Sequence, residues 1–330
     1  MDCIARISIL LSMNRQILVC LCTFLFLANG CSSFVTRLAF RSFGRIGADI
    51  EPAPHMITSP IRSDAGLAVG WVGHATVLIQ IDDKLIVTDP FFTNTVGMLV
   101  RRYVKPGLDP TVLPRVDYTL ISHIHFDHFN YESLDMLPHN GALILPPGAL
   151  AYTPDFNFKE IKELQWWEVM NEGGVTITAV PVQHFSGRYG FDNAWMPNTG
   201  YTGYIIQYHG YTVFFGGDTG YNPNLFKDLG SRYRIDLAIL PIAPGGPSGL
   251  GSRIHANAHG AMAMFKDLGA RFLMPMHYGT LYYGFDSTRT EAIEELRALA
   301  AEDSLTDRLV DLEIGGQRLI LQAPQIQPTN

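Results

Sequence analysis

The sequence predicts an α/β protein built in four layers, with two packed mixed sheets and helices on their outer faces. Two observations favour this fold class. Short apolar runs of strand length dominate the first half of the chain, whereas such runs alternate with helix-like segments in the second half. Residues 66–323 also contain no stretch with the composition of a linker, so we expect them to form one domain.

The expected strands are short runs rich in aliphatic and aromatic residues. The first two, 68–72 and 76–81, are followed by a tight turn at Asp82 and Asp83 and by a third run at 85–88. A second hairpin is expected around His209 and Gly210. The other strands are expected at 118–121, 142–145, 175–180, 203–208, 212–215, 237–240, 272–274 and 319–321, and helices at 131–137, 258–268 and 290–301.

Residues 1–30 have the organisation of a lipoprotein-type signal peptide. Arg15 precedes the apolar run 17–28, which is short for a membrane span, and small residues then lead to Cys31, as in a bacterial lipobox. We therefore expect an exported bacterial lipoprotein, held at a membrane surface on the periplasmic or extracellular side through lipidated Cys31. Ordinary secretion and a retained N-terminal anchor are the alternatives. Residues 31–65 are expected to be a tether and lead-in, and 324–330 a tail.

Composition and charge exclude several classes of protein. Apolar residues make up 47% of the 330 residues, which is typical of a globular chain and not of a disordered one. The formal net charge is −7, so no nucleic acid partner is expected. All four cysteines lie at or before Cys31, so the body of the chain has neither disulfides nor thiolate metal sites.

The strongest functional signal is the motif HIHFDH, which supplies His123, His125, Asp127 and His128 directly after an apolar run. Burying a polar group without a partner costs roughly 2 kcal/mol or more, so a buried cluster of this kind indicates a functional role. Imidazole nitrogens and carboxylate oxygens are suitable ligands for zinc, and this spacing lets one loop present them to two adjacent ions. The alternative is a solvated histidine-rich turn.

Three further residues fit the same use. His184, Asp218 and His277 each follow the end of an apolar run, where side chains from different strands can converge. A single histidine after a strand is more often a packed or surface residue. Their occurrence together, downstream of the HIHFDH loop, favours a shared metal site.

These motifs resemble those of the metallo-β-lactamase-fold hydrolase superfamily, whose mark is a loop of the form HxHxDH. Within it the chain is most similar to the branch that contains N-acyl-phosphatidylethanolamine-hydrolysing phospholipase D. The resemblance covers about residues 70–280 and includes WVGHATVLIQ, TDP, RRYVKPG, PVQHFSGR, GGDTGY and MHYGT. It implies the four-layer αββα metallo-β-lactamase fold.

The resemblance also implies a centre of two metal ions, with zinc favoured and iron or manganese as alternatives. The first ion would be held by His123, His125 and His184, and the second by Asp127, His128 and His277, with Asp218 bridging both. Two divalent ions outweigh the two carboxylates, which suits an anionic phosphate, and water bound to such ions is a nucleophile near neutral pH. Asp127 is accordingly expected to be essential for turnover.

Residues around the ligands are expected to support them or to contact substrate. Asp89 resembles a carboxylate that orients ligating imidazoles from behind, with a plain turn aspartate as the alternative. His74 is expected to pack or to form a hydrogen bond rather than to bind metal. Arg188 could meet a phosphate, although a surface salt bridge is the default expectation.

A histidine that lines the substrate cleft of the phospholipase branch is matched by His255, which we therefore expect to be catalytic. The match is incomplete, because Ala258 and His259 stand where that branch has Pro-Glu. The role of His259 is left open between flanking the following helix and reaching the leaving group. Aromatic residues in the surrounding loops, including Phe185 and Tyr189, could line a channel for an acyl chain or simply pack in the core.

The predicted function is a zinc-dependent phosphodiesterase of phospholipase D type that acts on N-acyl-phosphatidylethanolamine-like lipids. One alternative keeps the metals and changes the substrate, giving a lactonase or another hydrolase of a small anionic substrate. Another alternative is a surface lipoprotein that binds metal without catalysis.

Overall fold

The computed structural model describes residues 47–97, 100–189, 192, 196–197, 199–246, 249–281 and 288–323. From Ala48 onward they form one compact unit. The expected signal peptide, Cys31 and the 324–330 tail lie outside the described residues. No helix in the described part of the chain combines the length and the apolar character that a membrane span needs.

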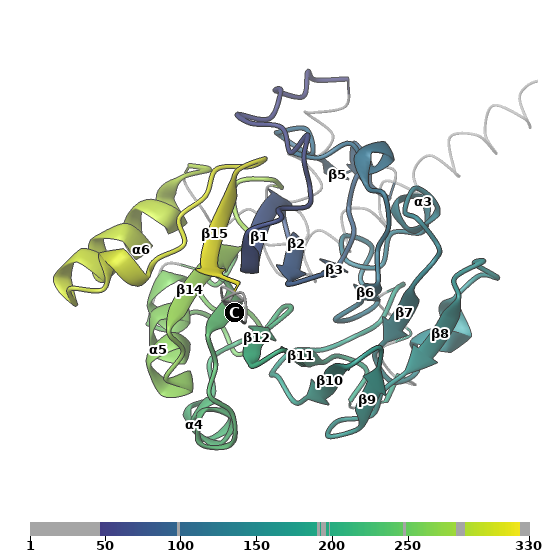
Figure 1. Ribbon diagram of the computed structural model, residues 1–330. Helices are drawn as coiled ribbons and strands as arrows, with labels where there is room; N and C mark the ends of the chain where they lie inside the picture. Colours follow the sequence, from purple (N-terminus) through teal and green to yellow (C-terminus); the bar gives the residue numbers. More distant parts are fainter. Residues whose placement is uncertain are drawn as a thin grey trace, which may run out of the picture. The chain divides into compact units, whose positions relative to one another are not determined.

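Two mixed sheets form the body of the unit (Figure 1). In the first sheet the strand order is β15 (Gln317–Gln322), β1 (Ala65–Gly73), β2 (Thr76–Ile81), β3 (Lys84–Thr88), β6 (Tyr118–Leu120), β7 (Ala142–Leu145) and β8 (Glu160–Glu163). In the second sheet it is β14 (Phe272–Met276), β13 (Leu237–Pro241), β12 (Tyr211–Phe215), β11 (Gly203–Tyr208), β10 (Val175–Val180) and β9 (Val169–Glu172). A separate ribbon pairs β4 (Thr95–Val96) with β5 (Val100–Arg101).

Each sheet has an antiparallel part and a parallel part. Pairing is antiparallel from β15 to β3 and parallel from β3 to β8. In the second sheet it is antiparallel from β9 to β12 and parallel from β12 to β14. As a result β1, β3 and β6 run in one direction, as do β10, β12 and β14.

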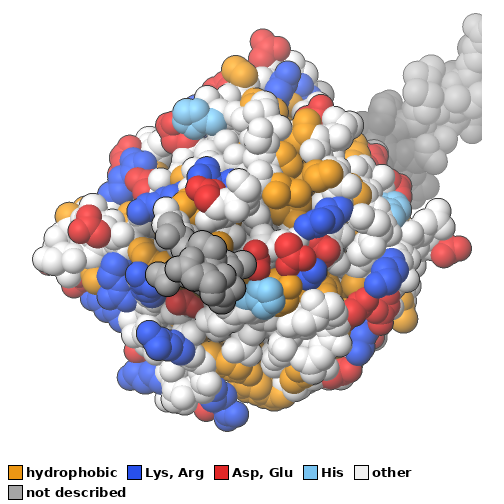
Figure 2. All heavy atoms as spheres, in the orientation of Figure 1, with side chains coloured by type: hydrophobic (Ala, Val, Ile, Leu, Met, Phe, Trp, Pro, Cys, Tyr) orange, Lys and Arg blue, Asp and Glu red, His pale blue; other side chains and the backbone are white. Residues whose placement is uncertain are grey.

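Helices cover the outer faces. In Figure 1, α4 (Pro223–Arg232), α5 (Ala258–Leu268) and α6 (Glu291–Glu302) lie beside the second sheet, and α3 (Tyr131–Asp135) lies near the first. Short 3-10 helices occupy Pro110–Val112, Ala149–Tyr152 and Thr306–Arg308. On the face seen in Figure 2, charged side chains of both signs are interspersed with apolar ones. The two mixed sheets with helices on their outer faces confirm the predicted four-layer α/β class.

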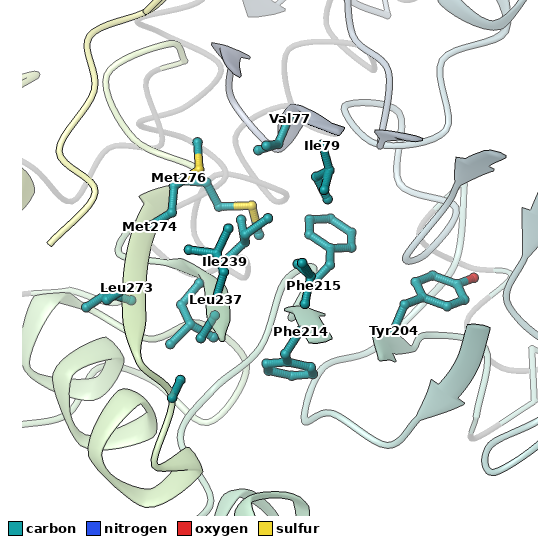
Figure 3. Packing of buried hydrophobic residues seen from close by; sticks show 14 of the residues in the cluster. Val77, Ile79, Tyr204, Phe214, Phe215, Leu237, Ile239, Leu273, Met274 and Met276 are labelled. Carbon is teal, nitrogen blue, oxygen red and sulfur yellow. The ribbon is translucent and has the colours of Figure 1, made fainter. Parts of the chain in front are cut away.

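The main core lies between the two sheets. Figure 3 shows Val77 and Ile79 of β2 pointing toward Phe215 of β12. Alternation along the strands sends neighbouring residues to the outer faces: Leu78 packs in a second cluster, and Phe214 meets Phe226 of α4 at 6.4 Å between ring centroids. The main core thus joins β2 of the first sheet to β12 of the second.

The lead-in packs more closely than expected. Ile57 is buried in the second cluster, and Glu51 and Ile57 form isolated bridges with Val104 and Leu108. Residues 48–65, which fall within the expected tether and lead-in, are part of the packed unit from Ala48 onward.

Candidate metal centre

The predicted site residues come together at one edge of the two sheets. The loops after the parallel-running strands supply them: His74 follows β1, Asp89 follows β3, His123 follows β6, His184 follows β10, Asp218 follows β12 and His277 follows β14. Strands that run in the same direction end at the same edge, which explains the convergence. Three of these residues have left-handed backbones, with φ of 57° at His74, 34° at Asp89 and 65° at His277. Such strain is typical of functional sites.

The first group consists of His123, His125 and His184, whose ring nitrogens lie within 4.8 Å of one another. His123 Nε2 is 2.7 Å from His125 Nδ1. His184 Nδ1 donates to the backbone oxygen of Ile254 at 2.8 Å, so its proton is on Nδ1. The buried Nε2 of His184 is then a bare lone pair with no hydrogen-bond partner in the described structure.

The second group consists of Asp127, His128 and His277, together with His74. His277 Nδ1 donates to Ala243 O at 2.9 Å, and His128 Nδ1 donates to Asp89 Oδ2 at 2.7 Å. Both residues therefore direct Nε2 inward, and these two nitrogens are 3.2 Å apart. In a histidine that binds metal, the other ring nitrogen usually donates a hydrogen bond, as Nδ1 of His128 and His277 does here.

Asp218 lies between the two groups. Its carboxylate is 3.3 Å from His128 Nε2, 3.1 Å from His277 Nε2 and 4.0 Å from His184 Nε2. The preceding Gly217 has a left-handed φ of 55°, and a Cβ there would lie 2.4 Å from Ser122 Cβ. A glycine is thus needed for the Asp218 loop to approach the loop that carries His123.

Asp89 supports ligands of both groups from behind. It is fully buried and accepts from Ser122 N at 2.7 Å, from Ser122 Oγ at 2.6 Å and from His128 Nδ1. Ser122 Oγ in turn lies 2.9 Å from His123 Nδ1. The expectation that Asp89 orients imidazoles agrees with this geometry, and a plain turn aspartate does not.

Burial and mutual repulsion set the protonation of the cluster. Burial and the neighbouring imidazoles hold the pKa of His123 and of His184 well below the usual value. Burial lowers the pKa of His125 to about 4 and that of His74 to about 3. Burial also disfavours a charged His128, but the carboxylates of Asp218, Asp127 and Asp89 outweigh it and raise the pKa of His128 well above the usual value. The electrostatics therefore favour neutral rings at His123, His125, His184 and His74 and a charged ring at His128 in the metal-free centre.

The two carboxylates in the centre stay ionised. Burial alone would raise their pKa values, yet the surrounding histidines hold the pKa of Asp127 and of Asp218 well below the usual range. Inward lone pairs, ionised carboxylates and an orphaned Nε2 on His184 are a donor set that fits divalent metal ions. The seven predicted ligands thus lie together, while their assignment to two ions stays a prediction.

The residues predicted to surround the ligands differ in where the structure places them. His255 lies at the site, with Nδ1 3.6 Å from Asp218 Oδ2, and burial lowers its pKa to about 4. His259 pairs with Glu295 at 3.0 Å in an exposed ion pair. The expectations for Arg188 were wrong, because it is buried and donates to the backbone oxygens of Ile124 and Phe129 at 3.3 and 2.8 Å. Its guanidinium thereby ties together the two ends of the HIHFDH loop.

Sequence reasoning missed several supporting groups. The acceptors Ile254 O and Ala243 O are backbone atoms, which leave no signal in residue type. Ser122 could have been noticed, because it directly precedes the HIHFDH motif. Of the loop aromatics expected to line an acyl channel or to pack in the core, Phe185 and Tyr189 are more than a third exposed, and the Phe185 ring packs edge-on against His125 at 4.7 Å. Four further aromatics of the same expected set, Phe191, Trp195, Tyr282 and Tyr283, lie outside the described residues.

Comparisons with known proteins identify a matching family model and related chains. Residues 84–278 match the family model of the beta-lactamase superfamily domain. An uncharacterized protein of Mycobacterium tuberculosis is 31% identical over 292 residues, which cover 83% of this chain and 75% of the relative. N-acyl-phosphatidylethanolamine-hydrolyzing phospholipase D 1 of Caenorhabditis elegans is 28% identical over 285 residues, which cover 80% of this chain and 79% of that protein.

A solved structure shares the fold. Isothiocyanate hydrolase from Delia radicum gut bacteria has a TM-score of 0.61 and covers 78% of this chain and 100% of that chain. At 18% sequence identity, this likeness concerns the fold alone.

Proposed function

Because the chain belongs to the metallo-β-lactamase superfamily of metal-dependent hydrolases, we propose that it is a binuclear zinc phosphodiesterase of phospholipase D type. The observation that carries the proposal is the gathering of the seven histidine and aspartate residues, in which the buried Nε2 of His184 has no hydrogen-bond partner among the described residues. The substrate class, N-acyl-phosphatidylethanolamine-like lipids, is supported by the named activity of the Caenorhabditis elegans relative.

In such a reaction, the proposed ligands would hold two zinc ions. Zinc ions would supply a nucleophilic water near neutral pH and would neutralise charge on the phosphate. His123, His125 and His184 would hold the first ion, and Asp127, His128 and His277 the second. Asp218 would bridge them, a role supported by the approach of its carboxylate to nitrogens of both groups.

His255 is the residue best placed to act on the substrate. Its side chain is 17% exposed, and its buried Nδ1 has no hydrogen-bond partner among the described residues. It can therefore hydrogen-bond to a phosphate oxygen or hold a proton near the departing alcohol. Phe185 and Tyr189, exposed by 37% and 56%, lie against His125 and Phe126 of the HIHFDH loop and offer apolar surface for an acyl chain.

The test is hydrolysis by the purified, zinc-loaded protein. N-acyl-phosphatidylethanolamine and a simple phosphodiester should be cleaved, with a phosphatidic acid and an N-acylethanolamine detected by mass spectrometry. Asp127→Ala should lose turnover, whereas the surface variant His259→Ala should keep it. Opening of lactones with both diesters intact would favour the lactonase alternative. Binding of two metals without turnover of any substrate would favour the non-catalytic lipoprotein.

We also propose that the protein is exported and anchored at a membrane surface through lipidated Cys31. This proposal depends on the signal-like organisation of residues 1–30. Mass spectrometry of the mature N-terminus should find an acylated Cys31, and Cys31→Ala should move the protein from the membrane fraction to the soluble fraction. An unmodified, uncleaved N-terminus contradicts it.

A further inference from the structure

His74 contacts Asp127 and His277, two residues proposed as ligands of the second ion. It is fully buried in the turn between β1 and β2, and its backbone is left-handed with φ of 57°. Non-glycine residues adopt this conformation at a cost, so the surrounding structure must hold it in place. The cost points to a use for the side chain at this position.

The main chain of His74 is fixed to the loop that carries His277. The His74 oxygen accepts from His277 N at 3.1 Å and from Trp71 Nε1 at 3.0 Å. The His74 N–H donates to Thr280 Oγ1 at 2.8 Å. The His74 and His277 rings lie against each other, with centroids 4.1 Å apart. His74 therefore has a fixed position relative to His277.

The side chain of His74 reaches the other loop of the site. Its Nε2 lies 3.1 Å from Asp127 Oδ2. An ionised carboxylate only accepts hydrogen bonds, so this Nε2 carries the proton. His128 and His277 have the opposite arrangement, because they donate through Nδ1 and turn Nε2 inward. The nitrogen of His74 that faces the site is thus used as a donor to a ligand and is not itself available as a ligand.

We propose that His74 is a positioning residue that fixes the carboxylate of Asp127 for the second metal ion. The proposal rests on the metal centre of the proposed function. Besides Phe91, the His74 ring lies against Asp127, His277 and His128, which are all assigned to the second ion. Loss of the Nε2 donor should therefore weaken the second ion selectively and leave the first ion bound.

The test compares two variants of matched size. His74→Gln keeps an amide donor that can reach Asp127, whereas His74→Met has a similar volume and no donor. Glutamine and methionine both bear a Cβ and both lack the tolerance of histidine for a left-handed backbone, so this conformation costs the two variants about the same. Zinc stoichiometry and the two stepwise affinities are measured by chelator competition on the full chain, and thermal unfolding of the metal-free protein reports folding.

His74→Met should weaken the second affinity by roughly 10- to 100-fold, as is usual when a group that orients a metal ligand is lost. The first affinity should stay unchanged, and His74→Gln should recover most of the loss. The proposal is overturned if His74→Met keeps both affinities, if both ions weaken together, or if His74→Gln is as weak as His74→Met. If His74→Met fails to fold, His74→Asn replaces it, because asparagine tolerates this backbone and its shorter amide falls short of Asp127.

These measurements separate the inference from the proposed function. Wild-type protein that binds two zinc ions but cleaves no phosphodiester contradicts the function and leaves the role of His74 intact. Wild-type protein that binds fewer than two ions overturns the role of His74.

Discussion

Replacement of Asp89 by asparagine tests how the centre controls the orientation of its histidines. Three donors face the Asp89 carboxylate: Ser122 N, Ser122 Oγ and His128 Nδ1, at 2.7, 2.6 and 2.7 Å. An asparagine amide keeps one acceptor oxygen and introduces an NH₂ group in place of the other. In either orientation of the amide, at least one donor then faces another donor in a fully buried position.

The orientation that keeps the Ser122 N–H bond places NH₂ against His128 Nδ1. His128 can accept from that NH₂ only by moving its own proton to Nε2, the nitrogen that should face the second ion. Loss of a hydrogen bond to a charged group costs about 1.5–3 kcal/mol. This range corresponds to a decrease of roughly 10- to 100-fold in the affinity of the second ion.

Chelator competition with zinc measures this affinity directly, and turnover of a phosphodiester should decrease in parallel. Asp82→Asn is the matched control, because Asp82 also pairs with a histidine Nδ1, that of His209 at 2.6 Å, but both side chains are exposed. The control should leave the affinity for zinc unchanged. If Asp89→Asn binds two ions as tightly as the parent, the orientation of His128 does not depend on Asp89 and the reasoning is refuted.

Two further substitutions probe the loops that bring the ligands together. Arg188→Met removes the hydrogen bonds to Ile124 O and Phe129 O and the cation that lies 4.0 Å from the ring centroid of Tyr131, so it should destabilise the protein by about 3 kcal/mol and weaken metal binding. Arg188→Lys should recover only part of the loss, because an ammonium group lacks the planar fork of donors. Gly217→Ala should cost on the order of 3 kcal/mol or more in urea unfolding, since its Cβ would lie 2.4 Å from Ser122 Cβ in addition to the strain of a φ of 55°. Gly210→Ala, at a φ of 83° with open space around its Cβ, should show the strain alone, on the order of 1 kcal/mol.

The outcomes that contradict these expectations are distinct. Wild-type stability and metal affinity in Arg188→Met would mean that the HIHFDH loop keeps its shape without the arginine. Equal costs for Gly217→Ala and Gly210→Ala would mean that the approach of the Asp218 loop to Ser122 is not limiting.

The positions of the ligands could be predicted from the sequence because the fold gives them a simple signature. His123, His184, Asp218 and His277 each follow an apolar run, and parallel-running strands end at the same edge of a sheet. Elements that were not predicted, such as strand β8 and helix α4, lack such apolar runs. Strand β8, Glu160–Glu163, is an edge strand that carries three charged residues in four, and edge strands are often charged. Helix α4 buries only Phe226 and Leu229, which is too few apolar positions for its period to stand out.

The supporting interactions could not be predicted for a different reason. The proton positions of His184 and His277 depend on the backbone oxygens of Ile254 and Ala243, which any residue type could supply. Arg188 illustrates the same limit, since an arginine that follows a ligand motif gives no indication of whether it faces a phosphate or a carbonyl. Only the packing around it, with the rings of Phe126 and Tyr131 4.4 and 4.0 Å from the guanidinium carbon, decides between the two.

These backbone acceptors give the segment between β13 and α5 a central role in the site. Ala243 O orients His277, a ligand proposed for the second ion, and Ile254 O orients His184, a ligand proposed for the first. His255, which we propose to contact substrate, directly follows Ile254, and its Nδ1 lies 3.6 Å from Asp218 Oδ2. A displacement of His255 is therefore transmitted through one peptide to the acceptor that sets the proton of His184. We therefore expect a substrate contact at His255 to be coupled to the orientation of His184 through the Ile254 carbonyl.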